Sequence, residues 1–419
     1  MEKLGAPREM TEEAGKTSDW KALKSVYDSA FFCSLGFFVV SFLIPIIAYG
    51  NMGATATQVA LIFSLLTLGV AMFSPVAGKI AKRGRRRESI FFGASTRAAA
   101  YLGMAASILL MDITLLILNS LVWGLGAAFY RVGSDAEISE RVLTENRAEA
   151  FGRREAANGR GSVIGAFLGF SVLFSFEGNA FPVFVMYAIA NLIGGVIVIR
   201  EKPPLEALAN PTVESIAMSA VGIGIAALVL AAAIDTFISA LLAPFVELYI
   251  LEVFTTDILL VALVYLPGGI LQGTFGGLMG RFADHKSKIG IVSAAVIVGA
   301  TSTLSLVFIP TLFSYPVDLV LVAVLFAIGT MTATMAYSVM SSVFGTAYEG
   351  RANEGFGMFE AVMGFSRFSA PLVGGILWDF LDPTAPFILV GLSGIILVPI
   401  YVYGMKTYEQ AIQQKESFQ

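Results

Sequence analysis

The sequence has almost none of the side chains that bind transition metals. Only one cysteine and one histidine occur in 419 residues. Cys33 lies in an apolar run with no second cysteine to pair with, and His285 lies in a basic loop. Because structural and catalytic zinc sites need clusters of Cys, His or carboxylate ligands, we expect no metal, no cofactor and no catalytic residues. A Gly-x-x-x-x-Gly-Lys-Ser/Thr phosphate loop is also missing, so we expect no ATP drive. The apolar spans offer no convergent set of nucleophile, acid or metal ligands, so we expect no enzyme activity.

Charge is scarce as well. Charged residues make up 14% of the chain and hydrophobic residues 56%, whereas a soluble domain has about 25% charged residues. The net charge is −4 and the basic residues are spread over several short loops, which argues against a nucleic-acid surface. The apolar excess indicates an integral membrane protein with the lipid bilayer as its main partner, and we expect a monomer.

Twelve apolar runs are long enough to cross a membrane. A bilayer core of about 30 Å needs about 20 residues per helix. The first run is too long for a signal peptide and lacks a small-residue cleavage site, so we expect it to be retained. The runs lie near residues 26–49, 56–78, 89–110, 113–138, 157–176, 181–200, 217–250, 257–279, 289–309, 316–340, 355–378 and 385–405.

The basic residues alternate between the two sides of this pattern. All Lys and Arg except Arg97, Arg131 and Arg367 lie at the termini, at the ends of the runs or in every second loop. Because cytoplasmic loops retain Lys and Arg, we expect a multi-pass protein of the cell (cytoplasmic) membrane with both termini cytoplasmic. A polar, proline-containing stretch divides the runs into two sets of six. The predicted division is a tail at 1–24, a six-helix bundle at 25–200, a cytoplasmic linker at 201–215, a second bundle at 216–405 and a tail at 406–419.

The two sets of runs repeat each other. Phe151-Gly152, Glu155-Ala156, Gly159 and Gly169 recur as Phe356-Gly357, Glu360-Ala361, Gly364 and Gly374 with a constant spacing. Gly78-Lys-Ile-Ala81 before the third run matches Gly280-Arg-Phe-Ala283 before the ninth. Repeats in parallel orientation place a pseudo-twofold axis along the membrane normal and a cavity between the halves.

With these features the chain resembles the major facilitator superfamily over nearly its whole length. The loops after Gly78 and Gly280 are similar to that family's Gly-x-x-x-Asp-x-x-Gly-Arg-Lys signature, although Lys82 replaces the first Asp. The resemblance implies an all-α membrane fold of twelve transmembrane helices in two pseudo-symmetric halves. It also implies that Asp284 braces the two halves on the cytoplasmic side, whereas the brace at Lys82 is altered or absent.

A carboxylate suits such a brace because a helix N-terminus presents free N–H groups and a positive dipole. We therefore expect Asp284 to cap the fifth helix. Lys82 is either intercepted by Glu354 or Glu360 or is an ordinary positive-inside residue. The expected gating residues are Gly78, Lys82, Arg86, Gly280, Asp284, Glu155 and Glu360.

Charges inside the spans are informative because each is costly unless it is paired or faces water. Arg131 and Asp135 are four residues apart and can pair on one helix face, so either a structural ion pair or a substrate role is expected. Arg97 lies only about a third of the way into its span, so its stem can snorkel, and it is expected to be structural.

Asp235 lies near the middle of the seventh run and is the first candidate for proton coupling. The alternative is a fixed ion pair with Arg367. Glu247 and Asp28 are the further coupling candidates.

Arg367 can itself bind an anionic group through its two-pronged guanidinium. Aromatic and polar side chains on the helices expected to line the cavity are candidates to share the substrate, although such stripes also arise from packing. The complete set of cavity candidates is Asn119, Trp123, Tyr130, Arg131, Tyr265, Gln272, Thr332, Tyr337 and Arg367.

These features predict a secondary active transporter that moves a small organic solute by alternating access. We expect coupling to protons or another ion, with export as the favoured direction. One alternative is a uniporter or exchanger of an organic anion bound at Arg367. Another is a membrane sensor or partner-binding protein built on a transporter fold.

Overall fold

The computed structural model describes residues 20–21, 23–54, 56–81, 85–201, 218–243, 245–285, 287–347 and 352–417. The predicted tail up to residue 19, Lys82 and nearly all of the 201–215 linker lie outside these residues.

The first half of the chain forms six membrane-length helical segments. The first segment is broken into two α-helices and a π-helical turn, with the break at Leu35-Gly36. Pro45 lies inside the second piece and cannot donate a backbone hydrogen bond there. The elements are α1 (Lys24–Ser34), α2 (Phe37–Ile46), η3 (Ile47–Asn51), α3 (Ala56–Ile80), α4 (Arg86–Leu109), α5 (Ile113–Arg141), η4 (Thr144–Asn146), α6 (Arg147–Ser175) and α7 (Phe181–Arg200).

The second half repeats this arrangement. Its first segment is also broken, between Ala240 and Val246, where the sequence predicts one continuous run. The elements are α8 (Met218–Ala240), α9 (Val246–Val253), α10 (Ile258–Asp284), α11 (Lys288–Leu312), α12 (Val317–Ala347), α13 (Ala352–Phe380) and α14 (Ala385–Ser417). The predicted twelve-helix fold in two halves is confirmed, with the first and seventh segments each in pieces.

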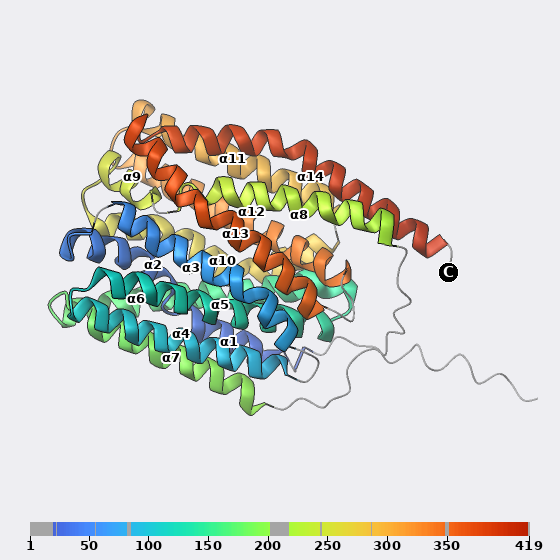
Figure 1. Ribbon diagram of the computed structural model, residues 1–419. Helices are drawn as coiled ribbons and strands as arrows, with labels where there is room; N and C mark the ends of the chain where they lie inside the picture. The colour runs from blue at the N-terminus through green and yellow to red at the C-terminus, as the bar shows by residue number, and fades with distance from the viewer. Residues whose placement is uncertain are drawn as a thin grey trace, which may run out of the picture.

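Four helices form the interface between the halves. In Figure 1 the helices of the second half lie above those of the first, with α3 and α6 facing α13 and α10. α3 packs along α13 and α6 packs along α10, which are the most extensive contacts between the two halves. The polar residues of these four helices and of the adjacent α5 and α12 are therefore the ones placed between the halves.

The apolar composition of the helices fits a bilayer. Eight helices of the described part are long and apolar enough to cross a membrane on their own. Two other long helices, α4 and α6, begin with clusters of charged residues.

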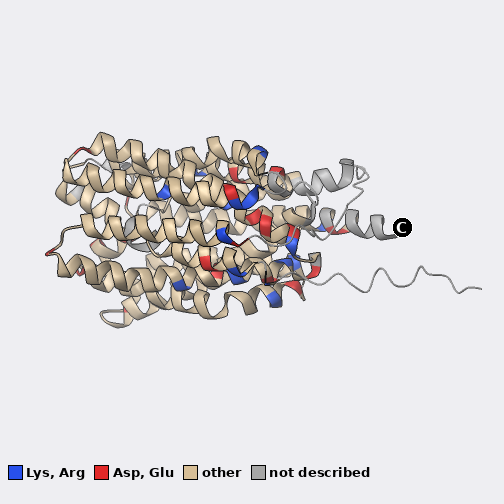
Figure 2. Cartoon of the chain, turned by 90° about the horizontal axis from the view of Figure 1, so that it is seen from below, with Lys and Arg blue, Asp and Glu red and all other residues tan. Residues whose placement is uncertain are grey.

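Charged residues gather at one end of the bundle, to which we refer as the charged end (Figure 2). This end holds the start of α4, the end of α5, the start of α6 and the α10–α11 turn around Asp284 and His285. The other end carries few charges. The charged end is the one that the sequence predicts to be cytoplasmic.

Candidate functional site

A buried network of charges lies between the halves. Arg154 on α6 forms an ion pair with Asp135 on α5, and their side chains are 5% and 1% exposed. Arg154 Nη2 also donates a hydrogen bond of 2.7 Å to the hydroxyl of Tyr337 on α12. The Tyr337 hydroxyl lies 3.4 Å from Asp135 Oδ2, to which it donates. One side chain of the second half thus completes an ion pair of the first.

A second ion pair crosses the interface directly. Arg131 Nε on α5 lies 3.1 Å from Glu360 Oε1 on α13. The Glu360 side chain is 1% exposed, whereas that of Arg131 is 32% exposed. Neither Glu360 oxygen accepts an aligned hydrogen bond from the part of the chain that the structure describes. The Arg131 guanidinium also lies over the Tyr337 ring, 5.2 Å from its centroid.

Arg367 lies two turns beyond Glu360 on the same helix, α13. Its guanidinium is within electrostatic range of Arg131, Glu360 and Tyr337. Among the described residues, however, no hydrogen bond or ion pair to Arg367 is formed, and its side chain is only half-buried. The site therefore contains a guanidinium whose donors make no hydrogen bond to the described residues.

These partners correct two predictions. Arg131 and Asp135 share a face of α5 but do not pair with each other, because each meets an opposite charge on another helix, Glu360 and Arg154 respectively. Asp235 does not pair with Arg367. Its carboxylate instead lies 3.5 Å from the hydroxyl of Tyr401, on α14.

The other two coupling candidates lie apart from this network. Glu247 on α9 accepts a hydrogen bond of 3.2 Å from the Tyr265 hydroxyl on α10, so these two residues are used together. Asp28 lies half-buried on α1 and has no hydrogen bond or ion pair to any described residue. The structure thus places the three candidates at separate positions.

Three predicted cavity residues face the interior of the first half instead. Asn119 donates to Ser107 of α4 at 3.2 Å, which uses its amide within the α4–α5 contact. Trp123 and Tyr130 surround the guanidinium of Arg97, whose central carbon lies 4.8 and 5.4 Å from the two ring centroids. Arg97 is 6% exposed and therefore does not snorkel. A cation held by aromatic faces is stabilised without a carboxylate, which the hydropathy pattern cannot reveal.

The remaining cavity candidates divide between the interface and the second half. Gln272 on α10 donates to Glu155 on α6 at 3.3 Å and so crosses the interface. Tyr337 joins both ion pairs, as described above. Thr332 bonds to carbonyls of its own helix, such as Ile328 O at 3.1 Å.

Asp284 lies at the N-terminus of α6. Its two carboxylate oxygens accept hydrogen bonds from the backbone N–H groups of Ala148, at 3.1 Å, and Glu149, at 2.8 Å. This is the contact that the sequence predicts, and it joins the halves at the charged end. Whether it gates transport stays a prediction.

The predicted gating residues Arg86, Gly78 and Gly280 also lie at the charged end, whereas Lys82 lies outside the described residues. Arg86 forms an ion pair of 2.6 Å with Glu140, within the first half. Gly280 lies against α6 beside Gly152, and Gly78 lies against Gly357 of α13. These two contacts are equivalent in the repeat. A side-chain carbon at Gly152 or Gly357 would meet backbone atoms of the facing helix, so the halves approach closely only because both residues are glycine.

Two arginines of the interface were missed by the hydropathy pattern. Arg154 holds Asp135, and Arg160 donates to Gly273 O of α10 at 3.1 Å. Both lie on α6, which begins at Arg147, ten residues before the predicted span at 157. The repeat contained a signal that α6 begins earlier than hydropathy predicts. Glu155 corresponds to Glu360, and Glu360 lies well inside α13, so Glu155 is expected to lie inside its own helix as well.

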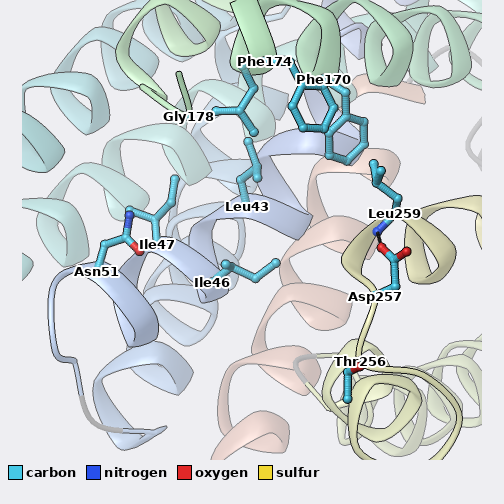
Figure 3. A pocket seen from close by; sticks show the side chains of 11 residues that line it. Leu43, Ile46, Ile47, Asn51, Phe170, Phe174, Gly178, Thr256, Asp257 and Leu259 are labelled. Atoms are coloured by element: carbon cyan, nitrogen blue, oxygen red, sulfur yellow. Dashed lines mark hydrogen bonds between the residues drawn. The ribbon is translucent and has the colours of Figure 1, made fainter. Parts of the chain in front are cut away.

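A pocket lies at the opposite end from the charges. It has a volume of about 380 Å³ and is open between α2, the end of α6 and the start of α10. Figure 3 shows its lining, in which Leu43, Ile46, Phe170 and Phe174 supply apolar surface and Asp257 lies at the rim. The halves are thus in contact at the charged end and leave a pocket between them at the other end.

Comparisons with known proteins agree with this architecture. The sequence profile described as Major Facilitator Superfamily matches residues 29–353. No curated protein matches the chain in sequence.

Solved structures with the same fold have low sequence identity to this chain. The human organic anion transporter MFSD10 superimposes with a TM-score of 0.68 at 15% identity, over 92% of this chain and 100% of that one. The Escherichia coli fucose:proton symporter FucP gives 0.69 at 11% identity, over 93% and 99%. The proton:xylose symporter XylE gives 0.68 at 13% identity, over 90% and 95%.

Proposed function

Since the chain belongs to the major facilitator superfamily, whose members are transporters and not enzymes, we propose that this secondary transporter carries a small organic anion held at Arg367. The anion is bound between the two halves and is released on either side by alternating access.

The observation that carries this proposal is the unused guanidinium of Arg367. Burying a charge without a partner is costly, and proteins retain such a group in a membrane mainly for function. Arg131 is within electrostatic range and its side chain is 32% exposed, so a carboxylate, phosphate or sulfonate would meet two sets of N–H donors. Guanidinium groups bind such oxyanions with paired hydrogen bonds, which a neutral solute cannot supply.

The contacts between the halves support alternating access, because they close one end of the bundle while the other end is open. The Asp284 cap, the Gln272–Glu155 hydrogen bond and the Arg131–Glu360 ion pair all join one half to the other on the charged side of the bundle. Rocking the halves apart at that end would break these contacts and close the pocket at the opposite end. We place the charged end in the cytoplasm, as the distribution of Lys and Arg indicates.

For the energy source we propose coupling to protons or another ion, with export as the favoured direction. Asp235 is the first proton-coupling candidate, because it is half-buried in a membrane helix and its contact is with a neutral hydroxyl, that of Tyr401. Two of the structural relatives are described as proton symporters and one as an organic anion transporter. An alternative is uncoupled uniport or exchange of the same anion.

The test compares matched charged and neutral solutes. Benzoate, benzenesulfonate and phenylphosphate share a ring with the neutral benzamide, so a difference between them reports the charge. We expect at least one of the three anions to raise the apparent melting temperature of the purified protein more than benzamide does. Arg367→Gln should abolish that difference. Equal effects of the anions and benzamide on the wild-type protein would contradict the proposal.

A further inference from the structure

We propose that Glu360 is a built-in competitor for the transported anion: it occupies Arg131 in the empty transporter and is displaced when an anion binds across Arg131 and Arg367. This inference rests on the proposed function, because it concerns the same site. It assigns to Glu360 a role in setting affinity.

The ion pair has the geometry of a contact that can be exchanged. Glu360 Oε1 lies 3.1 Å from Arg131 Nε, yet neither carboxylate oxygen accepts an aligned hydrogen bond from a described residue. By contrast, the Asp135–Arg154 pair is reinforced by Tyr337 and by Glu155. Glu360 is thus held by charge alone, whereas Asp135 is held by a network of hydrogen bonds.

The Arg131 side chain is partly exposed. It is 32% exposed although it lies on a membrane-spanning helix, while Glu360 is 1% exposed. Arg131 contacts Glu360 through Nε. Its two Nη atoms donate no aligned hydrogen bond to a described residue. An oxyanion can therefore approach these Nη donors without first removing Glu360, and then compete with it for the positive charge.

Arg367 supplies the second cation of the same site. It lies seven residues after Glu360, which places both on one face of α13, and it is within electrostatic range of Glu360 and Arg131. Two guanidinium groups therefore lie near one carboxylate, and only that of Arg131 pairs with it. The two guanidinium groups and the one carboxylate leave one positive charge, which a bound anion would neutralise. The negative charge of Glu360 repels that anion and so weakens its binding.

The other charged groups near Glu360 have partners of their own. From α5, Asp135 is paired with Arg154 of α6, and Tyr337 of α12 bonds to both. α3, which packs along α13, has no titratable residue from Ala56 to Gly78. On α8, Asp235 lies beside Tyr401 instead. Glu360 is therefore the acid that an anion at Arg131 would have to displace.

The test measures benzoate affinity by isothermal titration calorimetry on the purified full chain, with benzamide as the uncharged control. Glu360→Gln removes the competing charge with little change of shape, so benzoate should bind about tenfold more tightly than to the wild-type protein. Without benzoate, the same variant should have a lower apparent melting temperature, because Arg131 loses its partner.

The matched control is Glu137→Gln. Glu137 is a buried acid of α5, the helix that also carries Arg131, but it pairs with Arg87 and Arg141 within the first half, at 3.0 and 2.7 Å. It should leave benzoate affinity within about twofold of the wild type. An equal gain in both variants would show a general effect of removing negative charge and would overturn the competitor role.

Two further variants separate the possible failures. If Glu360→Gln does not fold, Glu360→Asp keeps the charge but withdraws it from Arg131, and it should still bind benzoate more tightly than the wild type. Unchanged or weaker binding to the Glu360 variants, with binding still lost in Arg367→Gln, overturns this inference and leaves the proposed function standing. Equal binding of benzoate to the wild type and to Arg367→Gln overturns the proposed function itself.

Discussion

At the scale of single residues, Arg154 and Asp135 show how the protein keeps two opposite charges away from water. Each is almost fully buried, and each contacts the other and Tyr337. We expect Asp135→Asn to destabilise the protein by about 3–5 kcal/mol, because the change leaves a buried guanidinium without its counter-charge. The measurement is the apparent melting temperature in detergent.

The neighbouring arginine provides the control for that change. Arg153 is 47% exposed, pairs with Glu149 one turn away and lies over Trp20. Arg153→Gln should cost less than about 1 kcal/mol. Replacing both buried partners, Asp135→Leu with Arg154→Met, should recover much of the lost stability. Equal losses in Asp135→Asn and Arg153→Gln would contradict the buried-pair interpretation.

Asp235 allows a clean test of proton coupling because it is not the partner of Arg367. If Asp235 carries the proton, Asp235→Asn should reduce pH-driven uptake to the level without a gradient and spare exchange of the solute, since an amide cannot take up or release a proton. Proteoliposomes with an imposed pH gradient measure both activities. Glu247→Gln is the parallel variant, and full pH-driven uptake by Asp235→Asn would transfer the role to Glu247 or Asp28.

Sequence reasoning identified which residues are charged inside the spans but not which ones meet. Arg131, Asp135, Glu360 and Arg367 were all singled out, whereas Arg131–Asp135 and Asp235–Arg367 were the wrong pairs. Spacing along one helix predicts a partner only on that helix. The actual partner depends on which helix packs alongside, and for Arg131 that is α13 of the other half.

At the scale of helices, the cap that Asp284 places on α6 links the end of α10 to the other half. Asp284→Ala removes two hydrogen bonds that join the end of α10 to the start of α6, and alternating access predicts that they are lost when the charged end opens. We expect a loss of about 1 kcal/mol in that state, or about a fivefold shift toward the state with the charged ends apart. Spin labels are attached to cysteines that replace Arg85 and His285 in a Cys33→Ser background. Double electron–electron resonance then measures the distance between the two labels, one in each half.

Asp112 provides the matched cap. It accepts a hydrogen bond of 3.1 Å from Leu115 N at the start of α5, within one half. Asp112→Ala removes a helix cap without touching the interface, so the label distance should stay the same. A change in Asp112→Ala as large as in Asp284→Ala would mean that loss of any cap, and not the link between the halves, moves the helices.

The glycine contacts make a second prediction at this scale. Gly152→Leu places a side chain against the backbone of α10 at Gly276 and Gly280, which costs the closed arrangement about 1–3 kcal/mol. We expect longer distances between the same labels. Gly299→Leu is the control, because nothing lies within 4 Å of that position. Unchanged distances in Gly152→Leu would show that the helices do not close by this contact.

Hydropathy predicted the number of helical segments but misplaced two of their features. α6 begins at Arg147 and not near 157, because its first turns are charged and pack against protein, whereas hydropathy detects only surface suited to lipid. The seventh segment is broken after Ala240, although its sequence is continuously apolar. Apolar composition specifies burial or lipid contact and does not specify where a helix bends.

At the scale of the whole molecule, the repeat in the sequence is visible as two halves joined by equivalent contacts. Gly152 meets α10 as Gly357 meets α3, and both contacts lie at the charged end. The cation site departs from this symmetry, because Arg131 and Glu360 cross the interface while Arg154 and Asp135 stay within one half. The repeat therefore predicted the arrangement of the helices, and the proposed binding site lies where the two halves differ.

The most direct test of anion transport by alternating access is counterflow in proteoliposomes. Vesicles loaded with unlabelled benzoate are diluted into a trace of labelled benzoate, with labelled benzamide as the control solute. A carrier that exposes one site to each side in turn should accumulate labelled benzoate transiently above its outside concentration, and Arg367→Gln should not. The absence of this overshoot in the wild type, or an equal overshoot in Arg367→Gln, would contradict the claim that Arg367 binds a transported anion.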